Sequence, residues 1–244
     1  MKELIAAGCS FVEGCSMLQT HEEDPVTAVV STETAEANRL SKLLSIGLYR
    51  KEINLANSGG SNERAIRRLY EYANTNGGKD KIFILGLTEL LRKEKYSSES
   101  KSYINWRNAI FFDNVVNFTK LKFWFDDIRD VSERDNLKPQ LKEYAKLDIM
   151  YFTDIDNELR MLSQQLNMLY SYIKSKEGEL LVFSAMMEQS DELKLDFKLF
   201  DMPIGKSWRE FIGSYDKDYS PSHHPAIADE HILSKHILKV LKEL

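Results

Sequence analysis

The residues best suited to chemistry follow short apolar runs that we expect to form β-strands. Ser10, in the sequence Gly-Cys-Ser-Phe, follows the first run, Asn57-Ser58-Gly59-Gly60-Ser61-Asn62 follows the second, and Thr88 follows the third. A serine hydroxyl at a strand end can attack an acyl carbon, and glycines let backbone amides approach the developing oxyanion. Four of the five histidines lie in the last 22 residues, where His224 precedes Pro225 and is the candidate base. These features predict nucleophilic acyl transfer at Ser10.

Five apolar runs alternate with longer helical patterns, which is the order expected of parallel strands joined by helical crossovers. Because ligands bind outside the carboxyl ends of such strands, this fold would collect the polar residues at one edge of the sheet. We expect strands at residues 4–7, 52–56, 81–87, 179–185 and 194–200, and helices at 33–48, 61–76, 154–174 and 227–243.

The helix that begins near Ser61 has a capping serine and ends at Asn76-Gly77-Gly78. Its pattern predicts an apolar face toward the core and two arginines, Arg64 and Arg68, that face solvent.

Residues 90–178 are too many for a simple crossover between the third and fourth strands. We therefore expect a largely helical insertion there, within a single domain that spans residues 1–244.

The order of the blocks resembles the SGNH/GDSL hydrolase family, and more narrowly its divergent phage and bacterial members. The resemblance rests on Gly-Cys-Ser-Phe, Asn-Ser-Gly-Gly-Ser-Asn, Leu-Gly-Leu-Thr-Glu, and His-Pro followed by Ala-Asp-Glu-His and a closing helix. It covers the first ninety residues and the C-terminal end, while the insertion lies outside it. The resemblance implies a three-layer α/β sandwich with a five-stranded, flavodoxin-like parallel sheet, and an esterase that needs no cofactor and no metal.

Carried over residue by residue, the resemblance makes Ser10 the nucleophile. In the family, the serine amide, a second-block glycine and a third-block asparagine form the oxyanion hole. The glycine position matches Gly59, with Gly60 next. Thr88 occupies the asparagine position, and its hydroxyl can donate one hydrogen bond. The carboxamide of Asn62 is either a substitute donor or a structural group at the helix N-terminus.

The closing block of the family makes His224, which precedes Pro225, the general base, with His223 as the alternative. An acid two or three residues earlier usually orients the imidazole, but those positions hold Pro221 and Ser222. Three alternatives stay open: Asp218 or Asp216 serves from upstream, a backbone carbonyl orients a Ser–His pair, or the site is degenerate.

We expect mainly structural roles for several histidine, cysteine and charged residues in these blocks or beside them. Arg92 and Glu89 are expected to form an ion pair that shapes the loop at the mouth of the cleft, although Arg92 can alternatively hold an anionic substrate group. His231 and His236 are expected to be packing or surface residues, and Cys9 is expected to fill space beside the nucleophile.

Composition excludes several partner classes. With 43% hydrophobic residues, 29% charged residues and a net charge of −5, the chain is typical of a globular protein without a broad cationic surface for nucleic acid. Its two cysteines favour a reducing, cytoplasmic compartment, with virion association left open. No stretch approaches the roughly 18 uninterrupted apolar residues of a membrane span, so we expect no membrane partner. The oligomeric state is not predicted.

Three functions fit the predicted site. The first is a serine hydrolase that cleaves a carboxylic ester, such as an acyl group on a carbohydrate, through an acyl-enzyme on Ser10. The second is a non-catalytic glycan-binding or structural module on the same fold, which Thr88 and the missing acid favour. The third is an acyltransferase, in which a sugar hydroxyl rather than water attacks the acyl-enzyme. The carbohydrate substrate is an analogy from the family.

Overall fold

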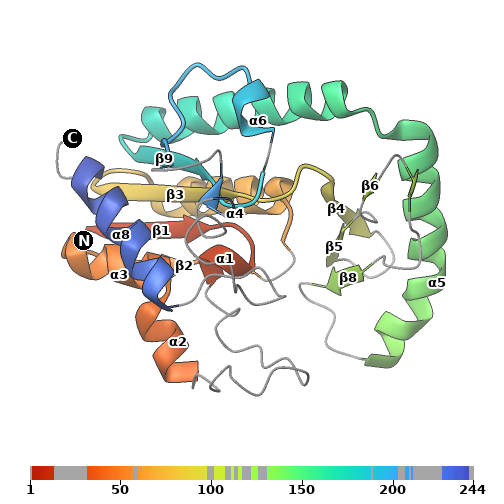
Figure 1. Cartoon of the computed structure of the whole chain (residues 1–244), viewed down its shortest axis with the longest axis horizontal. Coiled ribbons are helices and arrows are strands. Elements are labelled where there is room, and N and C mark those ends of the chain that lie inside the picture. The colour runs from red at the N-terminus through yellow and green to blue at the C-terminus, as the bar shows by residue number, and fades with distance from the viewer. Residues whose placement is uncertain are drawn as a thin grey trace.

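The computed structural model describes residues 2–13, 32–57, 60–97, 102–107, 111–112, 115–116, 122–125, 131–187, 189–202, 207–208, 210 and 227–241 (Figure 1). These residues form an α/β fold around a parallel four-stranded sheet in the order β2-β1-β3-β9. Its strands are β1 (Glu3–Ala7), β2 (Lys51–Asn54), β3 (Lys81–Leu87) and β9 (Glu179–Ser184).

Helices cover both faces of this sheet, so the predicted α/β layering is observed (Figure 1). One face packs against α1 (Ser10–Glu13), α3 (Leu40–Gly47) and α8 (Ile227–Leu241). The other packs against α4 (Asn62–Asn76) and α6 (Ile155–Ser175). Burial on both faces explains why β1 and β3 are nearly continuous apolar runs rather than alternating ones.

β1 lies at the point where the chain reverses its direction across the sheet. It is flanked by β2 on one side and β3 on the other, so the connection from β2 to β3 crosses over β1. Such a topological switch point is where ligands bind in open parallel sheets, beyond the carboxyl ends of the strands. The sheet therefore directs attention to the residues that follow β1 and β3.

The prediction of a fifth strand at 194–200 is wrong, because the parallel sheet of the described residues has four strands. Only Phe200 makes a parallel bridge, to Phe183 of β9. Residues 194–196 instead bind side chains of α6: Ser163 Oγ accepts from the Lys194 amide at 3.0 Å, and Asn167 bonds the backbone at two further points. The backbone groups of Lys194 and Asp196 are thus bonded to α6 side chains instead of to a neighbouring β-strand. A short 3₁₀ turn, η4 (Ser190–Glu192), precedes the segment.

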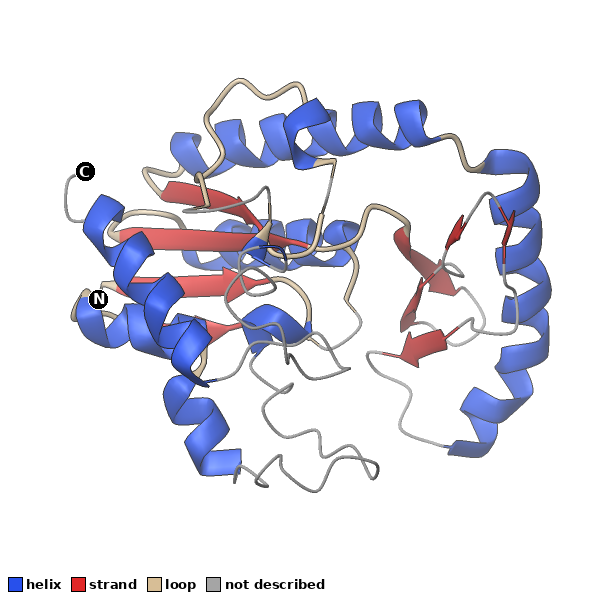
Figure 2. Cartoon of the chain, in the orientation of Figure 1, coloured by secondary structure: helices blue, strands red, loops and turns tan. Residues whose placement is uncertain are grey.

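The insertion between β3 and β9 is helical in its second part, as expected, but its first part is an antiparallel sheet in the order β4-β5-β8, which was not predicted (Figure 2). β4 reads Arg-Lys-Glu-Lys-Tyr-Ser, which lacks the apolar run that identified the other strands. Cross-strand contacts stabilise it instead, including Tyr96 edge-on to Tyr103 at 5.2 Å. The elements are β4 (Arg92–Ser97), β5 (Ser102–Arg107), β6 (Phe111–Phe112), β7 (Val115–Val116), β8 (Lys122–Phe125), α5 (Val131–Leu147) and the π-helical turn η3 (Asp148–Phe152).

Two helix predictions need correction. The helix expected at 33–48 is divided into α2 (Thr32–Asn38) and α3 by the extended backbone of Arg39 (φ −66°, ψ 149°), whose guanidinium pairs with Glu52 of β2 at 2.8 and 3.0 Å. Arg64, expected to face solvent, is buried and donates to the Leu55 carbonyl at 3.1 Å. Both arginines satisfy acceptors on or just after β2, which local periodicity does not reveal.

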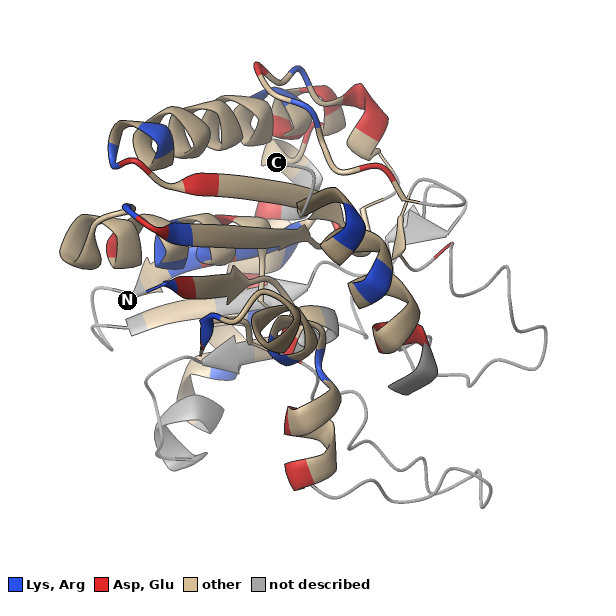
Figure 3. Ribbon diagram, turned by 90° about the vertical axis from the view of Figure 1, so that its left-hand side faces the viewer, with Lys and Arg blue, Asp and Glu red and all other residues tan. Residues whose placement is uncertain are grey.

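The capping signals of α4 are confirmed. Ser61 Oγ accepts from the Arg64 amide at 3.1 Å, and Gly77, with φ 69°, ends the helix by donating its amide to the Ala73 carbonyl at 2.9 Å. A positive φ of this size favours glycine at the helix end. Both basic and acidic residues are seen on the described helices and near the strand ends, whereas α2 has acidic residues but no Lys or Arg (Figure 3).

Candidate active site

A glycine turn joins β1 to α1 at the carboxyl end of the strand. Gly8 has φ +153°, and a Cβ there would lie 2.7 Å from Val12 Cγ2 and 2.9 Å from the carbonyl oxygen of Gly86. A Cβ on Gly86 would likewise meet Val12 at 2.6 Å. The two glycines thus allow α1 to pack directly on the ends of β1 and β3.

Ser10 is the first residue of α1. The amides of Val12 and Glu13 both donate to the Cys9 carbonyl at 3.0 Å, and Cys9 and Val12 are fully buried. This short turn fixes the backbone of Ser10 just beyond β1, at the switch point. The predicted position of Ser10 at a strand end is therefore confirmed for its backbone.

The second block lies beside the glycine turn. The Asn57 amide donates to the Gly8 carbonyl at 3.2 Å, and the Gly60 amide donates to the Asn57 carbonyl at 3.0 Å. A Cβ on Gly60 would come within 3.2 Å of the Gly8 carbonyl oxygen. These contacts hold the loop after β2 against the start of α1.

Asn62 and Thr88 tie the second block to the third. The Thr88 amide donates to Asn62 Oδ1 at 2.8 Å, and Asn62 Nδ2 donates back to the Thr88 carbonyl at 3.2 Å. Asn62 is 3% exposed and Thr88 is 1% exposed. Two reciprocal bonds in a buried setting fix the end of β3 to the first turn of α4, because breaking either one would leave a buried polar group without its partner.

The thioether of Met186, just after β9, is the centre of a second buried cluster. Its sulfur accepts from the thiol of Cys9 at 3.6 Å, from the hydroxyl of Thr88 at 3.9 Å and from the guanidinium of Arg92 at 3.7 Å. Arg92 also pairs with Glu89 at 3.0 Å, which confirms the expected ion pair. Sequence reasoning missed Met186, since an apolar side chain gives no signal of a polar role.

Several predicted site residues lie outside the described residues. These are Gly59, Asp216, Asp218 and His224, and of Ser10 only the backbone is described. The histidines of α8 have the expected packing or surface roles: His231 Nε2 lies 2.9 Å from Asn38 Oδ1, and His236 Nε2 lies 3.3 Å from the Asp201 carbonyl oxygen.

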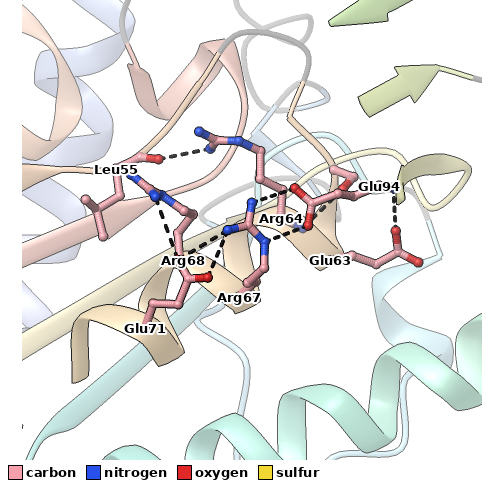
Figure 4. Close-up of polar contacts among 8 residues, drawn as sticks. Leu55, Glu63, Arg64, Arg67, Arg68, Glu71 and Glu94 are labelled. Atoms are coloured by element: carbon pink, nitrogen blue, oxygen red, sulfur yellow. Dashed lines mark hydrogen bonds and ion pairs between the residues drawn. The ribbon is translucent and has the colours of Figure 1, made fainter. Parts of the chain in front are cut away.

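A charged clamp joins α4 to the insertion (Figure 4). The guanidinium of Arg67 binds both carboxyl oxygens of Glu94 on β4 at 2.8 Å, and its carbon lies 3.7 Å from the ring centre of Tyr103 on β5. Its remaining nitrogen binds Glu71 at 3.0 Å. Sequence spacing could not identify this clamp, because Arg67 and Glu94 are 27 positions apart in the chain.

Glu63, which follows Asn62 in α4, makes a further contact between α4 and β4. Its carboxyl oxygen accepts from the Glu94 amide at 2.6 Å. Burial raises the pKa of Glu63, a shift opposed by that hydrogen bond and by the positive charge of Lys93. Lys93 itself pairs with Glu158 of α6. The strand β4 is thereby held against α4 and α6 through buried charges.

Within the described residues, no three His, Cys, Asp or Glu side chains are grouped so that they could hold a metal ion. None of the helices described there is long and apolar enough to cross a membrane.

The chain shows little similarity to known proteins. No protein family matches the chain, and no curated protein does. Among solved structures, the chain is similar to a carbohydrate esterase whose active site displays divergent catalytic and non-catalytic binding functions. The two share 12% sequence identity and a TM-score of 0.37, over 100% of this chain and 69% of that chain. A TM-score of this size does not define a shared fold, so the α/β architecture and the candidate site stand on the chain's own residues.

Proposed function

We propose that the chain is a serine hydrolase of the SGNH/GDSL type that cleaves carboxylic esters through an acyl-enzyme on Ser10. The observation that carries the proposal is the place of Ser10, directly after the buried turn at Gly8 and at the carboxyl end of the strand beside the switch point. A nucleophile in this position meets a substrate from outside the sheet, where the backbone can approach it closely.

In the proposed reaction, His224 takes the hydroxyl proton of Ser10 as its oxygen bonds to the ester carbon. The amides of Ser10 and Gly59 stabilise the oxyanion, and Asp218 orients the imidazole. His224 then gives the proton to the departing alcohol, and water hydrolyses the acyl-enzyme by the same steps.

Asn62 and Thr88 complete the proposed oxyanion hole as side-chain donors. In the resting chain the Asn62 amide donates to the Thr88 carbonyl, and the Thr88 hydroxyl donates to the sulfur of Met186. Either group would exchange that partner for the oxyanion. Thr88→Val should then lower kcat more than it raises KM, since the bond forms only with the transition state.

The test of the nucleophile is labelling with a fluorophosphonate probe, together with turnover of p-nitrophenyl acetate. We expect labelling and turnover in the unaltered chain and in Ser175→Ala, a serine substitution at the end of α6, but neither in Ser10→Ala. Turnover should also be lost in His224→Ala. Undiminished labelling of Ser10→Ala, or a folded unaltered chain that neither labels nor turns over, would contradict the proposal.

As substrate we propose a small acyl group on a carbohydrate, by analogy with the family alone. Release of acetate from acetylated oligosaccharides, compared with release from a short lipid ester, would test this choice.

A non-catalytic binding module on the same fold is the second candidate. Deep burial of Asn62 and Thr88, together with their bonds to each other, favours it because such groups are suited to holding loops rather than to meeting substrate. This candidate predicts oligosaccharide binding, measured by calorimetry, that survives in Ser10→Ala while the unaltered chain shows no labelling.

A further inference from the structure

Glu13, the last residue of α1, is a carboxylate without a hydrogen-bond partner beside the proposed nucleophile. It follows Ser10 by three positions, and its side chain is half-buried. Its Oε2 atom is enclosed, yet it accepts no hydrogen bond from the part of the chain that the structure describes. Enclosed polar atoms are nearly always paired in folded proteins, so an unpaired one at a candidate site calls for a functional explanation.

The helix α1 fixes the position of Glu13 relative to Ser10. Residues three apart on a helix are neighbours on its surface, with Cβ atoms about 5–6 Å apart. Val12 is fully buried, and its carbonyl accepts from Asn54 Nδ2, at the end of β2, at 3.4 Å. Glu13 therefore lies at the same carboxyl edge of the sheet as Ser10, one helical turn further along the chain.

The cation near Glu13 does not pair with it. Arg39, just before α3, donates from Nε and Nη2 to Glu52 at 2.8 and 3.0 Å. The hydrogen bond to Glu52 is the main reason that the pKa of Arg39 is raised, and the charge of Glu13 adds a smaller contribution. Glu13 thus lies near the start of α3, and the donor for its carboxylate must be sought elsewhere.

The first part of α8 reaches the same region. His231 Nε2, in α8, lies 2.9 Å from Asn38 Oδ1, at the end of α2 and close to the start of α3. α8 packs on the same face of the sheet as α1 and α3 (Figure 1). His224 precedes the first residue of α8 by three positions, a length of chain that spans at most about 10 Å. The histidine of the proposed reaction is thereby tethered to the region that holds Glu13.

We propose that Glu13 is the carboxylate that orients the imidazole of His224. The inference rests on the proposed hydrolase, and it assigns to Glu13 the role that sequence position alone gave to Asp218. The carboxylate accepts the N–H of one ring nitrogen, so that the other nitrogen is left to take the hydroxyl proton of Ser10. Glu13 keeps its negative charge and stabilises the imidazolium that forms in this step. Because it acts through His224, Glu13 is a positioning residue.

The first test compares Glu13→Gln with Glu36→Gln in the turnover of p-nitrophenyl acetate. Glu36 is the matched control, because its charge also acts on Arg39 but its side chain is exposed on α2. Glu13→Gln should lower kcat by about 10²- to 10⁴-fold with KM nearly unchanged, whereas Glu36→Gln should change kcat by less than about twofold. If the unaltered chain is active and Glu13→Gln is equally active, the inference is overturned and the hydrolase stands. An unaltered chain without turnover would overturn both.

The second test separates positioning by charge from a structural role. Glu13→Asp keeps the carboxylate and should retain more kcat than Glu13→Gln, and equal losses would refute the role of the charge. The urea midpoint of Glu13→Gln should match that of the unaltered chain, since the substitution keeps the size of the side chain. A loss of kcat accompanied by a lower midpoint would indicate a structural role instead. Glu13→Gln should also lower kcat more than Asp218→Asn does; the reverse order would return the orienting role to Asp218.

Discussion

Helices α5 and α6 follow each other in the chain and have similar lengths, yet they are stabilised differently. α6 buries an apolar stripe against the parallel sheet, with the side chains of Leu159, Leu162, Leu166, Leu169 and Ile173 inside. α5 buries Ala145 alone among its described side chains and exposes Tyr144 and Leu147. The comparison teaches that the parallel sheet supports the helices packed directly on it, whereas β4, in the outer part of the insertion, is held to α4 by the charged clamp.

Removing the clamp should have the largest effect on this arrangement. Glu94→Ala should lower the free energy of unfolding by about 3 to 5 kcal/mol, because it leaves the guanidinium of Arg67 without its buried partner. Glu71→Ala is the matched control: it removes the other carboxylate on Arg67, but the Glu71 side chain is 45% exposed against 4% for Glu94. Its effect should stay below about 1 kcal/mol. Urea denaturation measures both, and equal losses would show that the clamp does not join the insertion to the core.

The contrast between the helices themselves is tested by two leucines. Leu166→Ala, in α6, should cost about 2 to 5 kcal/mol, since it opens a cavity at a fully buried position. Leu147→Ala, in α5, should change the free energy of unfolding by no more than about 0.5 kcal/mol, because Leu147 is 46% exposed. Denaturant midpoints of the two variants provide the comparison. A large loss in the α5 variant would mean that α5 is packed within its own chain.

Glu230 gives the packed region a pH dependence. It is fully buried on α8, and within the described residues neither carboxyl oxygen has a hydrogen-bond partner of normal geometry. Burial raises the pKa of Glu230 well above 4.5, and the neighbouring Asp229 adds to this, while the nearby Leu40 amide opposes it. The folded chain holds Glu230 in its neutral form. Its full stability is therefore present below the pKa that Glu230 has in the unfolded chain, and the free energy of unfolding declines as the pH rises above that pKa.

Glu230→Gln should abolish this decline, because the amide cannot ionise. The variant should gain stability over the unaltered chain as the pH is raised from about 4.5 toward neutrality. Thermal unfolding at a series of pH values measures the difference, with the exposed Glu33→Gln as control. A difference between variant and parent that does not grow with pH would contradict the assigned state of Glu230.

A smaller effect than that of the clamp or of the buried leucine is expected at the start of α6. Asp154 caps α6, where its carboxylate accepts from the Asp156 amide at 3.0 Å. Asp154→Ala should cost about 1 kcal/mol, whereas Asp154→Ser should retain most of the stability because serine also caps well. If alanine and serine cost the same in urea denaturation, the cap does not contribute to the start of α6.

Much of the candidate site follows from local pattern. The position of Ser10 after β1, the cap at Ser61 and the pairing of Arg92 with Glu89 were all predictable, since each depends on neighbours within a few residues or on a strand end. The reciprocal bonds between Asn62 and Thr88 were not, because they need two strand ends to meet in space.

The sequence by itself determined the four parallel strands, α4, α6 and α8, because long apolar runs and periodic stripes must be buried wherever they lie. Only the tertiary structure decided the places where polar groups compete for partners. There, α6 side chains bind the backbone at 194–196 in place of a fifth strand, Arg39 breaks a predicted helix to reach Glu52, and Arg67 holds the charged strand β4. Such bonds form between residues far apart in the chain, so their free energy depends on the folded arrangement and leaves no local pattern.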